Sequence, residues 1–160
     1  MQGRMARSAR AGIRARPICE TRVVAAEEQV TTLHEGAMIL GAVLSPSGFV
    51  FVPGVHGNGS GGPSAQGRFV REAQSIDLHF RWSLGLVTYA WDGDVLSHAD
   101  FLRGLAITGA YPGFSDDPLD EFRHLAQDLS APLAGFVAGD RSEFDRALAA
   151  VQSMPTTRLP

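Results

Sequence analysis

A strict alternation of apolar and polar residues between Ile76 and Leu86 constrains this fold more than any other feature of the sequence. The apolar positions of the pattern are Ile76, Leu78, Phe80, Trp82, Leu84 and Leu86. Eleven residues with a period of two are typical of an antiparallel strand that has one face on a core and the other toward solvent. Gly85 is expected to mark a bulge or a bend in this strand.

A tight turn follows the strand. Asp92-Gly93 is the strongest short signal for a hairpin, because both central positions of the favoured two-residue turn need positive φ. Residues 94–96 then begin the returning strand. Ser97 is expected to cap the helix that comes next, and Asp100, three residues further on, completes a capping box.

A first hairpin is expected upstream of this region. Residues 37–44 (AMILGAVL) have the length and apolarity of a buried strand. The sequence SPSG at 45–48 is typical of a turn, so residues 49–52 are expected to return as the second strand. Pro53 is expected to end that strand, because proline cannot donate to a strand ladder. A second hairpin is expected to begin at residues 68–70.

Residues 54–67 (GVHGNGSGGPSAQG) are rich in glycine and have few side chains that can pack. This composition predicts a mobile loop. The loop lacks the lysine of a nucleotide-binding P-loop, and no helix begins after it to supply an anion-binding N-terminus. A phosphate site is therefore not expected here.

Three helices are expected after the sheet, beginning near Ser97, Asp117 and Asp140, each of which is a favoured N-cap residue. Residues 22–34 have only a weakly helical spacing of apolar positions. The sequence therefore predicts an α+β fold. Its sheet is antiparallel, has about four to six strands and is built from hairpins, and about three C-terminal helices pack on one face.

The charge of the chain is unevenly distributed. Residues 1–19 hold five arginines and no acid, whereas residues 20–160 hold nine arginines and seventeen acids, a net charge of −8. An acidic body is not suited to binding a nucleic-acid backbone. All fourteen basic residues are arginine, which we interpret as the coding bias of a GC-rich, bacterial genome. Cys19 is the single cysteine, so the chain cannot form an internal disulfide or a thiolate zinc cluster.

One folded domain is expected over residues 23–154. Residues 1–22 are interpreted as a basic disordered arm or as the product of a start codon assigned too early, and residues 155–160 as a disordered tail. No run approaches the roughly 20 apolar residues that a bilayer crossing needs. These features predict a cytoplasmic protein that does not associate with membranes.

Two sets of residues are candidates for binding a partner protein. The first set lies on the outward face of the long strand, where aromatic and arginine side chains are typical of binding hot spots; it comprises His79, Arg81, Tyr89 and Trp91. The second set is an acidic patch that can attract a basic partner; it comprises Asp116, Asp117 and Asp120.

A metal site is a weaker candidate. The oxygen and imidazole ligands that lie close together in the sequence are Asp92, Asp94, His98 and Asp100. Each of them also has a plain structural role, with His98 as an ordinary first residue of a helix. The single E-x-x-H pair, Glu121 and His124, is interpreted as part of a solvated helix face, since di-iron bundles need two such pairs.

The leading expectation is a small protein-binding or inhibitory module, of the general character of bacterial immunity proteins, without catalytic activity or a cofactor. Its partner is expected to be another protein. The alternative is a small enzyme or a binder of a metal or small molecule, with a site under residues 54–67 that uses His56, Asp92, Asp94 or His98. A third possibility is nucleic-acid binding through the arginine-rich arm.

Overall fold

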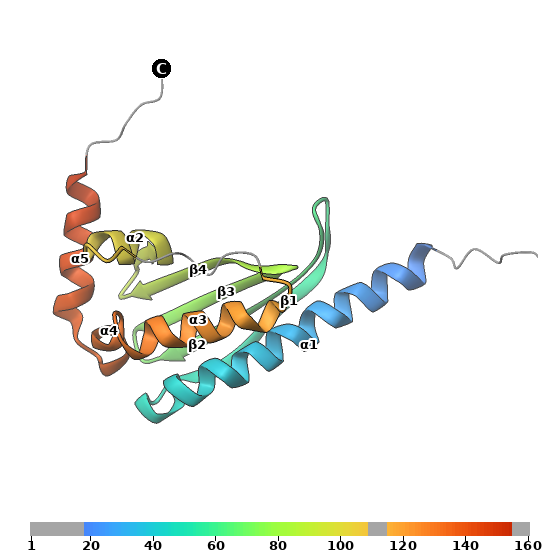
Figure 1. Cartoon of the computed structure of the whole chain (residues 1–160), viewed down its shortest axis with the longest axis horizontal. Helices are drawn as coiled ribbons and strands as arrows, with labels where there is room; N and C mark the ends of the chain where they lie inside the picture. The colour runs from blue at the N-terminus through green and yellow to red at the C-terminus, as the bar shows by residue number, and fades with distance from the viewer. Residues whose placement is uncertain (1–17, 109–114, 155–160) are drawn as a thin grey trace, which may run out of the picture.

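The computed structural model describes residues 18–108 and 115–154, with side chains from residue 26 onward. Its centre is an antiparallel sheet of five strands in the order β1-β2-β3-β4-β5, each paired with its neighbour in sequence (Figure 1). The strands are β1 (Val50–Gly59), β2 (Gly62–Arg71), β3 (Gln74–Arg81), β4 (Ser83–Trp91) and β5 (Asp94–Ser97). The predicted α+β class and the antiparallel sheet are confirmed.

Helices cover one face of this sheet. The helix α1 (Ile18–Leu44) precedes the sheet and leads into the short 3-10 helix η1 (Ser45–Ser47). The helices after the sheet are α2 (His98–Gly104), α3 (Pro118–Ser130), α4 (Ala134–Ala138) and α5 (Arg141–Ser153). Figure 1 shows α1 and α3 side by side across the sheet, with α2, α4 and α5 gathered at one end. The fold therefore has a long N-terminal helix that the sequence suggested only weakly.

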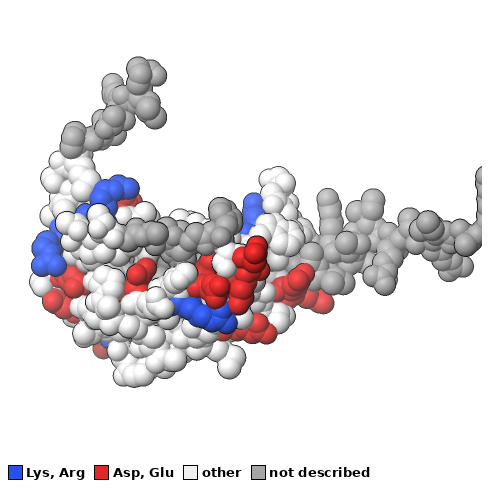
Figure 2. Space-filling view, in the orientation of Figure 1, with Lys and Arg blue, Asp and Glu red and all other residues white. Residues whose placement is uncertain are grey.

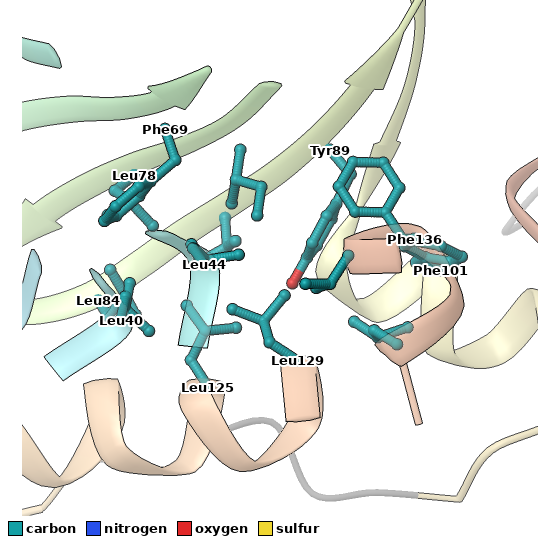
Figure 3. Close-up of a cluster of buried hydrophobic side chains, with 14 of the residues drawn as sticks. Leu40, Leu44, Phe69, Leu78, Leu84, Tyr89, Phe101, Leu125, Leu129 and Phe136 are labelled. Atoms are coloured by element: carbon teal, nitrogen blue, oxygen red, sulfur yellow. The ribbon is translucent and has the colours of Figure 1, made fainter. Parts of the chain in front are cut away.

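The core lies between the sheet and these helices (Figure 3). Leu40 and Leu44 of α1 meet Leu125 and Leu129 of α3 over the inward side chains of the strands, and all four are fully buried. At the other end, Phe136 of α4 packs among several aromatic rings. The core thus mixes aliphatic and aromatic side chains beneath α1 and is mainly aromatic around α4.

Residues 37–44 are helical, and the strand predicted there is wrong. Leu33, Ala37, Leu40 and Leu44 are buried and recur with the spacing of one helix face. The intervening residues are also apolar, so the sequence concealed this period. The chain enters β1 through η1 and Gly48, whose φ of 88° reverses its direction.

Residues 54–67 form a long hairpin rather than a loop. Pro53 does not end β1, since a register irregularity between Pro53 and His56 interrupts the ladder, which then continues to the Gly59–Gly62 pair. Proline is tolerated here because β1 is an edge strand with a local bulge. Gly67 allows a close contact, because a Cβ atom there would lie 2.6 Å from the ring of Phe51. Figure 1 shows the tip of this hairpin extending past the other strands.

The long strand predicted from Ile76 is two strands. It breaks at Trp82, which adopts a φ of 60° and joins β3 to β4 with Arg81 paired to Ser83. Trp82 is 58% exposed, so its predicted position on the core face is wrong. The register shifts again opposite His79, and Gly85 is the extra residue of this bulge, which confirms the predicted irregularity.

The predicted Asp92-Gly93 turn and the predicted N-caps are confirmed, and the Asp100 carboxylate accepts from the Ser97 hydroxyl at 2.6 Å. Asp92 and Gly93 have φ values of 51° and 94° and connect β4 to β5. The Ser97 hydroxyl accepts from the Asp100 N–H at 3.1 Å, and Asp117 and Asp140 cap α3 and α5 in the same way. The helix α1 already includes residues 18–22 of the predicted arm. Residues 1–17 and 155–160 lie outside the described residues.

Candidate functional site

The first predicted partner surface is divided between the two faces of the sheet. The turn at Trp82 and the bulge at Gly85 change which residues point inward, and a slip of one residue reverses every later side chain in a strand. Tyr89 is therefore fully buried, and the expectation that it is presented to a partner is wrong. Trp91 is half-buried against Phe136. His79 and Arg81 remain on the outward face, half-buried.

His98 belongs to a buried relay of hydrogen bonds and is not the ordinary helix residue that we expected. Its Nδ1 lies 2.8 Å from the Tyr89 hydroxyl, and its Nε2 lies 3.0 Å from Asp128 Oδ2. Burial lowers the pKa of His98, although the nearby Asp128 carboxylate opposes that shift. A neutral imidazole fits both partners, because Nδ1 then accepts from the tyrosine and Nε2–H donates to the carboxylate. At 1% exposure, His98 can stabilise the fold but cannot reach a substrate.

The other metal candidates are held in separate ion pairs. Arg141 pairs with both Asp92 and Asp94, and Asp100 pairs with Arg103. Among the described side chains, no group of three or more His, Cys, Asp or Glu residues is placed to hold a metal ion. The structure thus divides the sequence-adjacent candidates among three local arrangements: Asp92 and Asp94 share Arg141, Asp100 pairs with Arg103, and His98 bonds to Tyr89 and Asp128.

The acidic patch on α3 is partly neutralised within the helix. Asp117 and Asp120 both pair with Arg123, and Figure 2 shows red and blue side chains together over α3. The hydrogen bond from Arg123, followed by the one from the Leu119 N–H, lowers the pKa of Asp117. Asp116 is exposed. The patch is therefore a capped and paired helix start.

Two buried polar side chains hold the turn between β3 and β4. Gln29 of α1 accepts from the Trp82 N–H at 2.9 Å, and Glu121 of α3 accepts from the Leu84 N–H. Burial raises the pKa of Glu121, which is only 2% exposed. The interpretation of Glu121 and His124 as one solvated face is thus wrong for Glu121. Sequence reasoning missed these contacts because they join distant segments.

A groove of about 860 Å³ separates the second half of α1 from the edge strand β1. Its walls are mainly apolar and contain no acid, arginine or lysine; they comprise His34, Ala37, Met38, Gly41, Ser45, Gly48, Phe49, Val50, Phe51, Pro53 and Phe69. A smaller hollow of about 190 Å³ shares His34 and Pro53 with it and extends toward His56. Together, the groove and the hollow run between α1 and β1 toward the distal part of the β1–β2 hairpin.

The strand β1 beside this groove is open. It has a strand neighbour only on its β2 side, so its other edge has no strand partner among the described residues. The apolar side chains along it are accessible, with Val50 at 62%, Val55 at 72% and Met38 of α1 at 78% exposure. An exposed apolar surface beside an unpaired edge is unusual on a monomer, which makes this surface the candidate functional site.

A simple sequence signal accompanies this surface. Residues 36–67 contain no Asp, Glu, Lys or Arg, and this run covers the last third of α1, all of β1 and the hairpin turn. In Figure 2, the surface over the C-terminal end of α1 is mostly white, the colour of residues other than Lys, Arg, Asp and Glu. The run could have indicated the site, but the misassigned strand and loop concealed that its parts lie together.

Comparisons of the chain with protein-family models, with curated proteins and with solved structures found no match. No helix in residues 18–108 or 115–154 has both the length and the apolarity that a membrane crossing needs.

Proposed function

We propose that this protein is a protein-binding module that takes up an extended polypeptide segment as an additional strand beside β1. The observation that carries the proposal is the uncharged, apolar groove lying directly along an open edge strand. Strand addition of this kind obtains affinity from main-chain hydrogen bonds and specificity from pockets for alternate side chains.

The groove is held in shape before any partner arrives. Leu33, Leu40 and Leu44 on the opposite side of α1 are buried against the sheet, which fixes the helix beside β1. Within the groove, the rings of Phe51 and His34 meet edge to face, with 5.8 Å between their centroids, and Phe51 also packs against Phe69. A preformed site lowers the entropy lost on binding.

The walls define the chemistry of the segment. Phe49, Phe51 and Met38 offer apolar contact, and His34 is the one titratable side chain of the lining. A charged side chain would lose its hydration here without gaining an ion pair. The segment that fits is therefore extended and uncharged, with apolar side chains at alternate positions.

This proposal keeps the expected class of function and moves the surface. The predicted face around Arg81, Tyr89 and Trp91 is divided between the two sides of the sheet, as described above. The small-molecule alternative placed its site under a loop at 54–67, and that segment is a hairpin. The arginine-rich arm lies mostly outside the described residues, so nucleic-acid binding through it stays a prediction.

The test uses a phage-displayed library of random heptapeptides selected on the immobilised full chain. We expect enriched peptides to be uncharged and apolar at alternate positions. Met38→Glu places a charge at an exposed groove position and should weaken their binding at least about tenfold. Met154→Glu is the matched control, because Met154 is also exposed and follows α5.

Two results would contradict the proposal. One is a chain that is monomeric in solution and whose library yields no peptide enriched over the Met38→Glu protein. The other is a set of enriched peptides that bind the wild type and Met38→Glu equally well. Circular dichroism of both variants checks that the fold is retained.

A further inference from the structure

We infer, resting on the proposed function, that the segment taken up at this site is β1 of a second copy of the chain. The two β1 strands pair antiparallel across a two-fold axis and join two sheets into one. The inference follows from the backbone symmetry of an edge strand, from the distribution of charge and from the contrast between the two edges of the sheet.

The edge strand is self-complementary. Two identical strands can pair antiparallel across a two-fold axis, because each then offers the other the same pattern of donors and acceptors. The stretch Val50–Val52 is uncharged and apolar, so β1 itself meets the description of the segment that the groove selects. No further sequence feature is needed in the partner.

Charge also favours contact through this surface. Residues 20–160 of each copy have a net charge of −8, so two copies repel when their acidic faces approach. The run at 36–67 carries no charged residue and is exposed in large part. Pairing through β1 keeps the carboxylates of the two copies apart. Interfaces between identical subunits are also more apolar than those between transient partners.

The opposite edge does not compete for pairing. β5 pairs with β4 through only four residues, and Asp94 lies at its start. This edge is therefore short and begins with a charged residue, and both features are common ways to prevent strand pairing. One open edge per chain produces a closed dimer rather than a fibre.

The axis relating two antiparallel strands runs perpendicular to the sheet, so both copies of α1 lie on the same side of the joined sheet. The groove of each copy then borders the seam. Met38, which is 78% exposed and projects from α1 at the groove, becomes covered by the second copy. The pairing thus explains an exposed methionine on an otherwise well-packed helix.

The experiment is sedimentation velocity of the full chain over a concentration series, with wild type, Val50→Lys and Val95→Lys. Val50 on β1 is 62% exposed and Val95 on β5 is 56% exposed, so the same substitution is made on the two edges at similar cost to the fold. We expect dimers for the wild type and for Val95→Lys. Val50→Lys adds a charge to the uncharged seam of each copy, where it would lose hydration without gaining an ion pair, and should raise the dimer dissociation constant at least about tenfold.

Amide hydrogen exchange on the same samples gives a second measure. The β1 amides should be protected in the wild-type dimer and exchange faster in Val50→Lys. A dimer whose dissociation constant is unchanged by Val50→Lys, with β1 exchange also unchanged, would overturn the assignment of the surface.

The outcomes separate this inference from the proposed function. A wild type that stays monomeric throughout the series but binds peptides from the library rules out the second copy and leaves peptide recognition standing. A monomer that binds no library peptide contradicts both. A dimer broken by Val50→Lys supports both, because the groove then has an occupant of the expected chemistry.

Discussion

The two edges of the sheet differ in length, charge and cover. β1 has ten residues, none of them charged, and an open groove along its inner side. β5 has four residues, begins with Asp94 and is followed directly by α2, which packs against it. Arg141 of α5 reaches the turn before β5 and pairs with Asp92. One edge is short and begins with a charged residue, and the other is long and uncharged.

The side chains beneath the two edges also differ, because Phe136 is more deeply buried than Phe51. Phe136, on the β5 side, is fully buried and contacts five aromatic rings, those of Phe49, Tyr89, Trp91, Phe101 and Phe144. Phe51, on the β1 side, is half-buried and contacts the rings of His34 and Phe69. The comparison predicts that shortening Phe136 costs more stability than shortening Phe51, beside which apolar surface stays accessible.

The largest effect should come from shortening these two phenylalanines. Phe136→Ala leaves a cavity in a fully buried aromatic cluster and should lower the free energy of unfolding by about 3–5 kcal/mol. Phe51→Ala removes a half-buried ring and should cost about 1–2 kcal/mol. Urea denaturation of both variants measures the difference. Equal losses would mean that the β1 side contributes to stability as much as the β5 side does.

Two helix glycines test whether the packing is tighter on the β5 side than beside the groove. A Cβ atom on Gly104 of α2 would lie 2.8 Å from the Ala147 Cα of α5, and backbone cannot easily move aside. Gly104→Ala should therefore destabilise the protein by about 1–3 kcal/mol. A Cβ on Gly41, in the groove, would meet only the Ser45 hydroxyl at 3.6 Å. Gly41→Ala should stabilise α1 by about 0.5–1 kcal/mol.

Thermal unfolding of the two glycine variants beside the wild type is the measurement. A Gly104→Ala protein as stable as the wild type would show that α2 and α5 can separate easily. The packing on the β5 side would then be looser than the structure indicates.

The smallest expected effect is a pH dependence of folding stability that comes from His98, on the β5 side. The pKa of His98 is lowered in the folded protein, so the unfolded chain binds a proton more readily as pH falls through the ordinary histidine pKa near 6.5. The contribution of His98 to the free energy of unfolding is therefore complete above that pH. It decreases as pH falls, by at most about 1.4 kcal/mol per pH unit. His98→Gln removes this contribution.

Urea titrations at pH values from about 7.5 down to 5.5 compare the two proteins. The loss of stability in the wild type should be steeper than in His98→Gln. Parallel profiles would show that Asp128 compensates for the burial of the imidazole. The effect of Glu121 on stability runs in the opposite direction, because its raised pKa makes stability fall as pH rises. Glu121 is present in both proteins, so its effect cancels in the comparison.

Part of the site could have been read from the sequence. The absence of charge from residues 36–67 is visible there, and His79 and Arg81 were placed on the correct face of the sheet. The groove itself could not be predicted, because one wall is a helix that looked like a strand and the other is a strand that looked like a loop. Tyr89 was misplaced because Gly85 adds one residue to the register.

Short runs of adjacent residues were enough to predict the local features of this protein. The Asp92-Gly93 turn, the Ser97 cap and the bulge at Gly85 depend on the backbone preferences of a few adjacent residues, so short patterns predict them. The α+β class follows in the same way from successive hairpins and capped helices.

The tertiary structure alone decided the features that join distant segments. Residues 37–44 are apolar enough for either a strand or a helix, and their packing against both the sheet and α3 selects the helix. The relay from Tyr89 through His98 to Asp128 and the groove beside β1 likewise exist only once separate elements meet. The physical reason is that burial and contact between such segments are set by packing, which overrides local preference.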